Sequence, residues 1–265
     1  MSSSLASAGA LLLLWGLTGP ALAQEEDASP VDEIPTARPN DLLDPKAKTT
    51  EEEPRERASS GKPDEEVVEP PVWKLLVQDE EDYAACLDDL KGYGVSYREL
   101  PPVTDEEVAD CGIVRPLEID SIVPGVSVEP KAVLRCPAVR ALAEWVTRFA
   151  LPASLALPDR GPLISLQQGS TYVCRRRNNA DDGLVSEHAF GNAIDIMAFG
   201  FASGDPIPVE PRMREGTMAE AFQRAVRASA CLSFTTVLGP GTDSAHADHL
   251  HLDIKERRGD FRLCQ

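Results

Sequence analysis

Six cysteines place the strongest constraint on how this chain can fold, and all of them lie beyond residue 85. Their spacing contains no CxxC pair, so a zinc site built from cysteines is not expected. An even number of cysteines predicts disulfides, up to three of them, if the chain is exported. Many full pairings are open to six cysteines. We expect Cys86 with Cys111, Cys174 with Cys231, and Cys136 with Cys264.

Residues 1–23 have the pattern of a secretory signal peptide. The apolar run from Ala8 to Leu17 is too short to span a bilayer comfortably. Ala21-Leu22-Ala23 then has the small-x-small pattern of a cleavage site. No Lys or Arg precedes the run, so an uncleaved anchor is the competing interpretation. We expect cleavage before Gln24, export to the periplasm, and no stable membrane anchor afterwards.

Residues 24–70 differ from the rest of the chain in composition. They combine many prolines with acidic clusters at 25–27, 51–53 and 64–66, and they contain few large apolar residues. Such a segment buries too little surface to offset its ordering entropy. We interpret it as a disordered, acidic, Pro-rich linker, and an interaction tail for a basic partner is the alternative. The folded domain is expected over residues 71–265.

The overall charge narrows the classes of partner. The net charge of −18 argues against a nucleic-acid-binding protein, which needs a basic face. The same charge disfavours docking on anionic lipid. The hydrophobic content of 42% is sufficient for a core.

The domain mixes helix and strand patterns without a regular βαβ rhythm. Apolar periodicity predicts helices over residues 79–91, 137–150 and 217–230, the last with a capping box formed by Thr217 and Glu220. Alternation predicts strands over residues 95–100, 163–168, 192–199, 234–238 and 249–254, and short strands with turns over 113–134. These patterns predict an α+β fold, in which a small antiparallel sheet is flanked by helices and stabilised by disulfides.

The chain has four histidines, and they form two clusters. His188 stands in a Gly-containing segment before a predicted strand, and the other three are His246, His249 and His251. Isolated histidines are usually surface or satisfied core residues. This grouping, with none elsewhere, is more typical of a metal site.

The second histidine cluster lies on a predicted strand. Side chains at positions i and i+2 of a strand point to one face, so His249, His251 and Asp253 share a face. Leu250 and Leu252 then share the other face and are expected to be buried. Two imidazoles about 7 Å apart at Cα, from the rise of a strand, can address the same small site.

The first cluster offers further ligands from residues 186–196. Asp195 alternates with Ile194 and Ile196, so its carboxylate faces away from the apolar side. Gly191 allows a close approach of neighbouring chain segments, and His188 can reach the side on which Asp195 lies. These two residues and one strand histidine make an N2O set. That set leaves a fourth position for water, which is typical of a catalytic zinc site.

Two motifs resemble those of a known superfamily. The pattern SxHxxGxAxD at residues 186–195 resembles the first metal motif of the D-Ala-D-Ala metallopeptidase, lysostaphin-type and hedgehog superfamily. The pattern HxxHxH at 246–251 is similar to the partner motif of penicillin-insensitive murein endopeptidases. More narrowly, CRxRN at 174–178, SEH at 186–188 and FTTVLGPG at 234–241 resemble the bacterial extensin-like C-terminal domain family. That resemblance covers residues 71–265.

The resemblance implies a role for each histidine. His188, Asp195 and His251 would hold Zn²⁺ in the antiparallel sheet. His249 would be the general base beside a zinc-activated water, whose pKa zinc lowers to about 7. His246 would hold or shuttle the proton.

Other polar residues carry open alternatives. Carboxypeptidases and dipeptidases of the superfamily have a glutamate three residues before the last ligand. Here Asp248 takes that place, which makes it the alternative base and shifts the analogy towards endopeptidases. Arg175 or Arg177 would bind the oxyanion or a substrate carboxylate, and a solvated basic turn is an equally good explanation. Asp253 would orient a ligand histidine or be an ordinary strand-end residue. Ser186 would contact substrate or cap a turn.

Together these expectations describe an exported, zinc-dependent hydrolase, a metallopeptidase of the murein endopeptidase or carboxypeptidase type. It would cleave peptide (amide) cross-links in peptidoglycan, so its partners would be peptidoglycan peptides, with or without an activator. The alternative is a catalytically weak zinc-containing module that binds peptidoglycan or a partner protein, as in the hedgehog branch. A purely structural wall protein has the least support, because the prolines show no repeat.

Overall fold

The computed structural model describes residues 70–177 and 183–265. The predicted signal peptide, the predicted linker up to residue 69, and Asn178 of the extensin-like motif lie outside the described residues. Within the described part of the chain, no helix has the length and apolar character needed to cross a bilayer.

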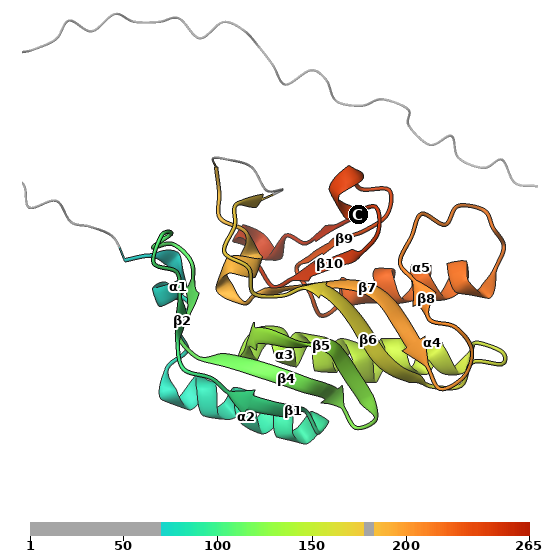
Figure 1. Cartoon of the computed structure of the whole chain (residues 1–265), viewed down its shortest axis with the longest axis horizontal. Coiled ribbons are helices and arrows are strands. Elements are labelled where there is room, and N and C mark those ends of the chain that lie inside the picture. The colour runs from blue at the N-terminus through green and yellow to red at the C-terminus, as the bar shows by residue number, and fades with distance from the viewer. Residues whose placement is uncertain (1–69, 178–182) are drawn as a thin grey trace, which may run out of the picture. The chain divides into compact units, whose positions relative to one another are not determined.

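A nine-stranded sheet forms the centre of the domain (Figure 1). Its strands follow the order β1-β4-β5-β6-β7-β10-β9-β11, and β8 pairs with β7. Their bounds are β1 Ser96–Glu99, β4 Pro116–Val123, β5 Val126–Arg135, β6 Leu163–Ser170, β7 Ala193–Phe201, β8 Ile207–Pro208, β9 Thr236–Leu238, β10 Leu250–Asp253 and β11 Leu263–Cys264. A separate two-stranded sheet pairs β2 (Val103–Thr104) with β3 (Gly112–Ile113).

The predicted α+β class is confirmed, but the sheet is larger than expected and is mixed. Most neighbouring strands are antiparallel, whereas β5 pairs with β6 and β9 with β11 in parallel. A parallel pair needs a long crossover connection. The helical segment between β5 and β6 supplies it for the first pair.

The helices include α1 at the start of the domain, and α3 and α5, which run behind the strands in Figure 1. Their bounds are α1 Val72–Leu75, α2 Glu80–Tyr93, α3 Cys136–Trp145, α4 Leu151–Leu155 and α5 Met218–Ala230, with a π turn η1 at Val146–Ala150 and 3-10 turns η3 Glu187–Phe190, η4 Ser244–His246 and η5 Arg258–Asp260. The helix predicted over 137–150 therefore continues past its expected end. The π turn precedes Pro152, which cannot donate the hydrogen bond of a regular helix.

The main core lies between the helices and one face of the sheet. Trp145 of α3 is fully buried and packs edge-on against Phe199 of β7 and Phe234, with ring centroids 6.2 and 6.4 Å apart. Its indole Nε1 donates to the carbonyl of Val226 in α5 at 3.0 Å. Trp145 of α3 thus contacts both β7 and α5 on one face of the sheet.

Residues 113–134 depart from the prediction of short strands and turns. They contain two long antiparallel strands, β4 and β5. The prolines that suggested interruptions occupy positions that a strand tolerates. Pro116 begins β4, Pro124 precedes the left-handed Gly125 in the connecting turn, and Pro130 lies in an exposed section of β5.

The predicted disulfide pairing is wrong. The structure pairs Cys86 with Cys136, Cys111 with Cys174, and Cys231 with Cys264. The Cα–Cα distances are 6.2, 5.5 and 6.0 Å, within the range that a disulfide requires. The prediction failed because tertiary packing, rather than position along the chain, decides the partners. For example, α2 packs on α3, and this contact brings two buried cysteines together.

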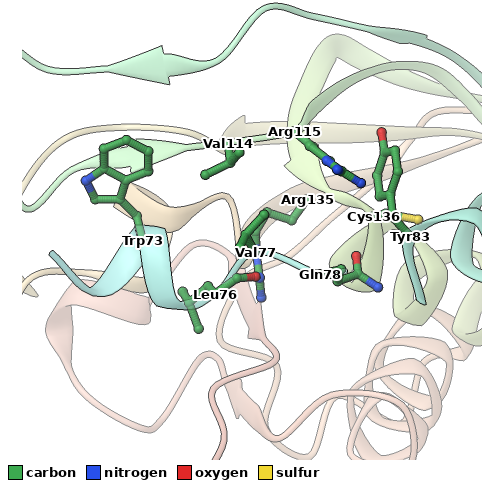
Figure 2. A pocket seen from close by; sticks show the side chains of 9 residues that line it. All are labelled: Trp73, Leu76, Val77, Gln78, Tyr83, Val114, Arg115, Arg135 and Cys136. Carbon is green, nitrogen blue, oxygen red and sulfur yellow. The ribbon is translucent and has the colours of Figure 1, made fainter. Parts of the chain in front are cut away.

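The start of the domain is anchored to the strand β5 by Arg135. Its guanidinium donates to the carbonyl of Leu76 and, at 2.8 Å, to the side-chain oxygen of Asn192. Figure 2 shows Arg135 beside Leu76 and Val77, at a small cavity of about 20 Å³. Burial lowers the pKa of Arg135 to about 10. This residue therefore connects the segment after α1 with residues 186–195.

Candidate metal centre

Strands β7 and β10 place two of the predicted ligands side by side. The strands are antiparallel, and their register sets Asp195 opposite His251. The residues that flank these two along each strand are buried in the main core: Ile194, Ile196, Leu250 and Leu252. Asp195 and His251 consequently lie on the sheet face away from that core, as alternation predicts.

The 3-10 turn η3 brings in the third predicted ligand. Ser186 caps this turn, with its hydroxyl accepting from the backbone N–H of His188 at 3.4 Å. Gly191 ends the turn with φ of 65°. A Cβ at this glycine would lie 2.4 Å from Cδ1 of Ile113, so both its conformation and its neighbour require glycine. His188 is held fully buried beside Asp195.

The three donor atoms converge on one point. His188 Nε2 lies 3.2 Å from Asp195 Oδ1 and 3.1 Å from His251 Nδ1, and these last two atoms are 2.9 Å apart. Ligand atoms about 2.0–2.1 Å from a tetrahedral ion would be about 3.3 Å from one another. Among the described residues, these three side chains form a group whose ligand atoms all lie within 4.8 Å of one another, so they could hold one metal ion.

Hydrogen bonds on the far side of each imidazole fix which nitrogen faces the centre. His188 Nδ1 lies 2.6 Å from the carbonyl of Thr171, and His251 Nε2 lies 3.1 Å from Asp253 Oδ2. A carbonyl and a carboxylate only accept, so both of these nitrogens donate. In their neutral forms, the two histidines then direct lone pairs at each other and at Asp195. Such an arrangement is repulsive unless a proton or a cation lies between them, and the residues therefore fit a metal ion.

The titration behaviour of the metal-free cluster has the same origin. Burial raises the pKa of Asp195, but hydrogen bonds from His188 and His251 outweigh it and hold that pKa well below its usual range. Burial lowers the pKa of His251, whereas its bonds to Asp195 and Asp253 raise it, with a net result of about 9.

The other two histidines lie beside the ligands, and each has its own carboxylate. His249 Nδ1 contacts Asp248 Oδ1 at 2.9 Å, and its Nε2 is 3.7 Å from Asp195 Oδ1. His246 Nδ1 contacts Asp243 Oδ1 at 2.7 Å. The hydrogen bond from His246 lowers the pKa of Asp243. In both histidines the contact at Nδ1 leaves Nε2 for other partners.

A cavity of about 280 Å³ opens over the cluster, and we call it the metal cavity. Its lining includes seven of the eight predicted site residues, namely Arg175, Arg177, His188, Asp195, His246, His249 and His251. Asp248 does not line the cavity, and its side chain is 73% exposed. Its contact is with His249 rather than with the three ligands.

Sequence reasoning missed several residues that hold the site together. Asp243 supports His246, and the spacing of three residues between them was the available signal. Glu187 and Lys255 line the cavity and form an ion pair at 2.8 Å, although they are far apart in the chain. Thr171 contributes its backbone carbonyl, so no side-chain pattern could reveal it.

Comparison with known proteins agrees with the narrower of the two resemblances. The family model described as "Extensin-like protein C-terminus" matches residues 84–265, which include every residue of the cluster and its cavity. Comparisons with curated proteins and with solved structures found no significant match. Since the family model covers more than half of the sequence, the chain belongs to the extensin-like C-terminus family.

Proposed function

We propose that this protein is an exported zinc-dependent hydrolase that cleaves peptide cross-links in peptidoglycan. In this proposal it is a metallopeptidase related to the D-Ala-D-Ala metallopeptidase, lysostaphin-type and hedgehog superfamily. The proposal combines the two sequence motifs with the geometry of the metal centre.

The donor set supports zinc as the cofactor. His188 Nε2, His251 Nδ1 and Asp195 Oδ1 would hold the ion with two nitrogens and one oxygen, a ligand set that suits a catalytic zinc ion. When bound there, zinc would supply Lewis acidity, lowering the pKa of a water to about 7 and polarising a carbonyl. The Thr171 carbonyl and Asp253 orient the two ligand imidazoles, as outer partners do in zinc enzymes.

The observation that carries the proposal is the pair of histidines that are not ligands. His249 keeps Nε2 beside the metal centre while Nδ1 contacts Asp248, so Nε2 is placed to take a proton from the attacking water. The ring of His246 lies 5.3 Å from that of His249, and Asp243 supports it. His246 is thus positioned to pass the proton on. A purely structural zinc site needs neither dyad, which favours a hydrolase over a binding module.

Arg175 is suited to stabilise the oxyanion that forms on the substrate carbonyl. It lines the metal cavity and is only partly buried. Among the described residues, its guanidinium is engaged by no acidic side chain, whereas Arg177 lies 3.7 Å from Glu187. A guanidinium in a partly enclosed cavity can stabilise developing negative charge without reorganising.

The disulfides support export. All six cysteines are among the described residues, and all are paired. Three disulfides are typical of an oxidising compartment such as the periplasm. Peptidoglycan is the polymer that a periplasmic amidase-type hydrolase meets.

Digestion of isolated peptidoglycan tests the proposed activity. Zinc-loaded protein is expected to release peptide-containing fragments that mass spectrometry identifies, and these fragments name the bond that is cut. His188→Ala should abolish release because it removes a ligand. His249→Ala should retain bound zinc, measured by elemental analysis, and lose at least about a hundredfold in rate, as expected for a general base. Zinc-loaded, disulfide-bonded protein that releases nothing would contradict the hydrolase and favour the binding module.

A further inference from the structure

A second, larger cavity adjoins the metal cavity. Its volume is about 910 Å³, and it extends along α1 and the segment that follows it. Three residues, Arg177, Glu187 and Lys255, line both cavities. They therefore form the wall that the two cavities share, which we call the junction.

The junction is organised around one buried carboxylate. Glu187 is 6% exposed, and its Oε2 accepts from the side-chain amide of Asn192 at 2.9 Å. Its Oε1 accepts from Lys255 Nζ at 2.8 Å and lies 3.7 Å from Arg177 Nη2. The side chains of Lys255 and Arg177 remain 33% and 42% exposed. One carboxylate thus positions two cations, whose remaining donors are open to the cavities.

The charge of the cavity contrasts with that of the whole chain. The protein carries a net charge of −18. The metal cavity, however, is lined by the cations Arg175, Arg177, Lys255 and Arg257 against the carboxylates Glu187, Asp195 and Asp253. A divalent ion at the proposed centre would add two further positive charges. A cavity with this excess of positive charge attracts an anionic group.

Lys255 lies at a distance that suits a peptide substrate. It follows His251 by four residues, which is at most about 13 Å at Cα for an extended chain. Its ammonium group reaches back to Glu187, the residue next to His188. A group bound by Lys255 would therefore lie within a few residues of an amide at the metal centre.

We propose that Lys255 and Arg177 form a carboxylate-binding subsite, so that the substrate is a peptide with a free carboxylate within a few residues of the scissile amide. This inference rests on the proposed function and specifies its substrate class. Arg177 offers planar donors and Lys255 a compact charge, and both suit a carboxylate. Glu187 is a positioning residue, because its carboxylate lies against both cations.

Binding of a synthetic peptidoglycan stem pentapeptide to the zinc-loaded full chain tests the subsite. The His249→Ala background keeps the peptide intact during calorimetry. Four forms of the peptide are compared, with free carboxylates, an amidated C-terminus, amidated side-chain carboxylates, or both modifications. The free acid is expected to bind about ten- to hundredfold more tightly than the fully amidated form, as for a charge-assisted hydrogen bond. The partly amidated forms identify which carboxylate is bound.

Substitution of Lys255 connects this preference to the subsite. Lys255→Met should remove most of the preference and leave the affinity for the fully amidated form unchanged. The double variant Lys255→Met/Glu187→Gln does not leave the buried Glu187 carboxylate without Lys255, and it should show the same loss of preference as Lys255→Met. The preference should return with Lys255→Arg, and Lys131→Met, which replaces an exposed lysine of β5, is the matched control.

Equal binding of all forms, a preference retained in both Lys255 variants, or no measurable binding would overturn the inference. The wild-type protein is then incubated with the same peptides to separate the two proposals. A carboxylate preference without cleavage would support the subsite and count against the hydrolase.

Discussion

Asp253 supports the candidate metal centre without being one of its three candidate ligands. Its Oδ2 accepts from His251 Nε2 at 3.1 Å, and its Oδ1 accepts from the backbone N–H of Lys255 at 2.9 Å. The carboxylate thereby determines which nitrogen of His251 faces Asp195. The hydrogen bond to the imidazole also raises the basicity of the ligand nitrogen.

Asp253→Asn is therefore expected to weaken zinc binding by about ten- to hundredfold. Competition against a chromogenic chelator at pH 7 measures the affinity. Asp120→Asn, which removes an exposed carboxylate on β4, is the control and should leave the affinity unchanged. Equal affinities in the two variants would show that Asp253 does not support the ligand.

At the start of helix α5, only one of the two hydrogen bonds of the predicted capping box forms. Thr217 accepts from the backbone N–H of Glu220 at 3.1 Å, as a capping box predicts. The Glu220 carboxylate does not return to Thr217, and instead accepts from the backbone N–H groups of Arg214 and Gly216 at 3.0 and 2.9 Å. Glu220 thus holds the preceding loop rather than closing the box.

This contact makes the stability of the protein depend on pH. The hydrogen bond from the backbone N–H of Gly216 is the main reason why the pKa of Glu220 lies below its usual value of 4.5. Burial raises this pKa, whereas the backbone N–H of Arg214 lowers it further. A lowered pKa stabilises the fold above the unfolded value, and this stabilisation is lost as pH falls through the folded value. Between pH 6 and pH 3, Glu220→Gln should therefore lose less free energy of unfolding than the wild type does. Chemical denaturation at both pH values measures this difference, and Glu81→Gln, an exposed residue of α2, should behave like the wild type.

Elements with clear periodicity were predictable, whereas those that depend on long-range pairing were not. Alternation placed Leu250 and Leu252 in the core and His251 opposite to them, because strand geometry alone determines these faces. The long strands β4 and β5 were missed, because prolines locally resemble breaks. A strand tolerates a proline only where the neighbouring strand does not need its backbone N–H, and this depends on the pairing of the strands.

The three disulfides join segments that are distant in sequence. The bond between Cys231 and Cys264 closes 33 residues and attaches the C-terminal strand β11 to the end of α5. Neither cysteine belongs to the fully buried core, so its replacement leaves little cavity. This bond therefore allows the effect of the crosslink to be measured by itself.

The double variant Cys231→Ala/Cys264→Ala is expected to lower the free energy of unfolding by about 3–4 kcal/mol, from the loop-closure entropy of the unfolded chain. Urea denaturation without reductant measures the change. Metal affinity should be retained, because the three proposed ligands lie on β7, β10 and η3. An unchanged denaturation midpoint would mean that the C-terminal strand is held by other contacts.

The α+β class and the two faces of β7 and β10 were predictable from the sequence, because local periodicity sets them. The choice of His251 rather than His249 as the third candidate ligand came from the resemblance to known motifs. Three other features depend on how the chain folds: the cysteine partners, the support of His246 by Asp243, and the junction of Glu187 with Lys255 and Arg177. The pairing of the cysteines and of Glu187 with Lys255 joins residues 33 to 68 positions apart, and nothing local records it. Such contacts arise from the packing of whole elements, and that packing also gives the metal cavity its charge.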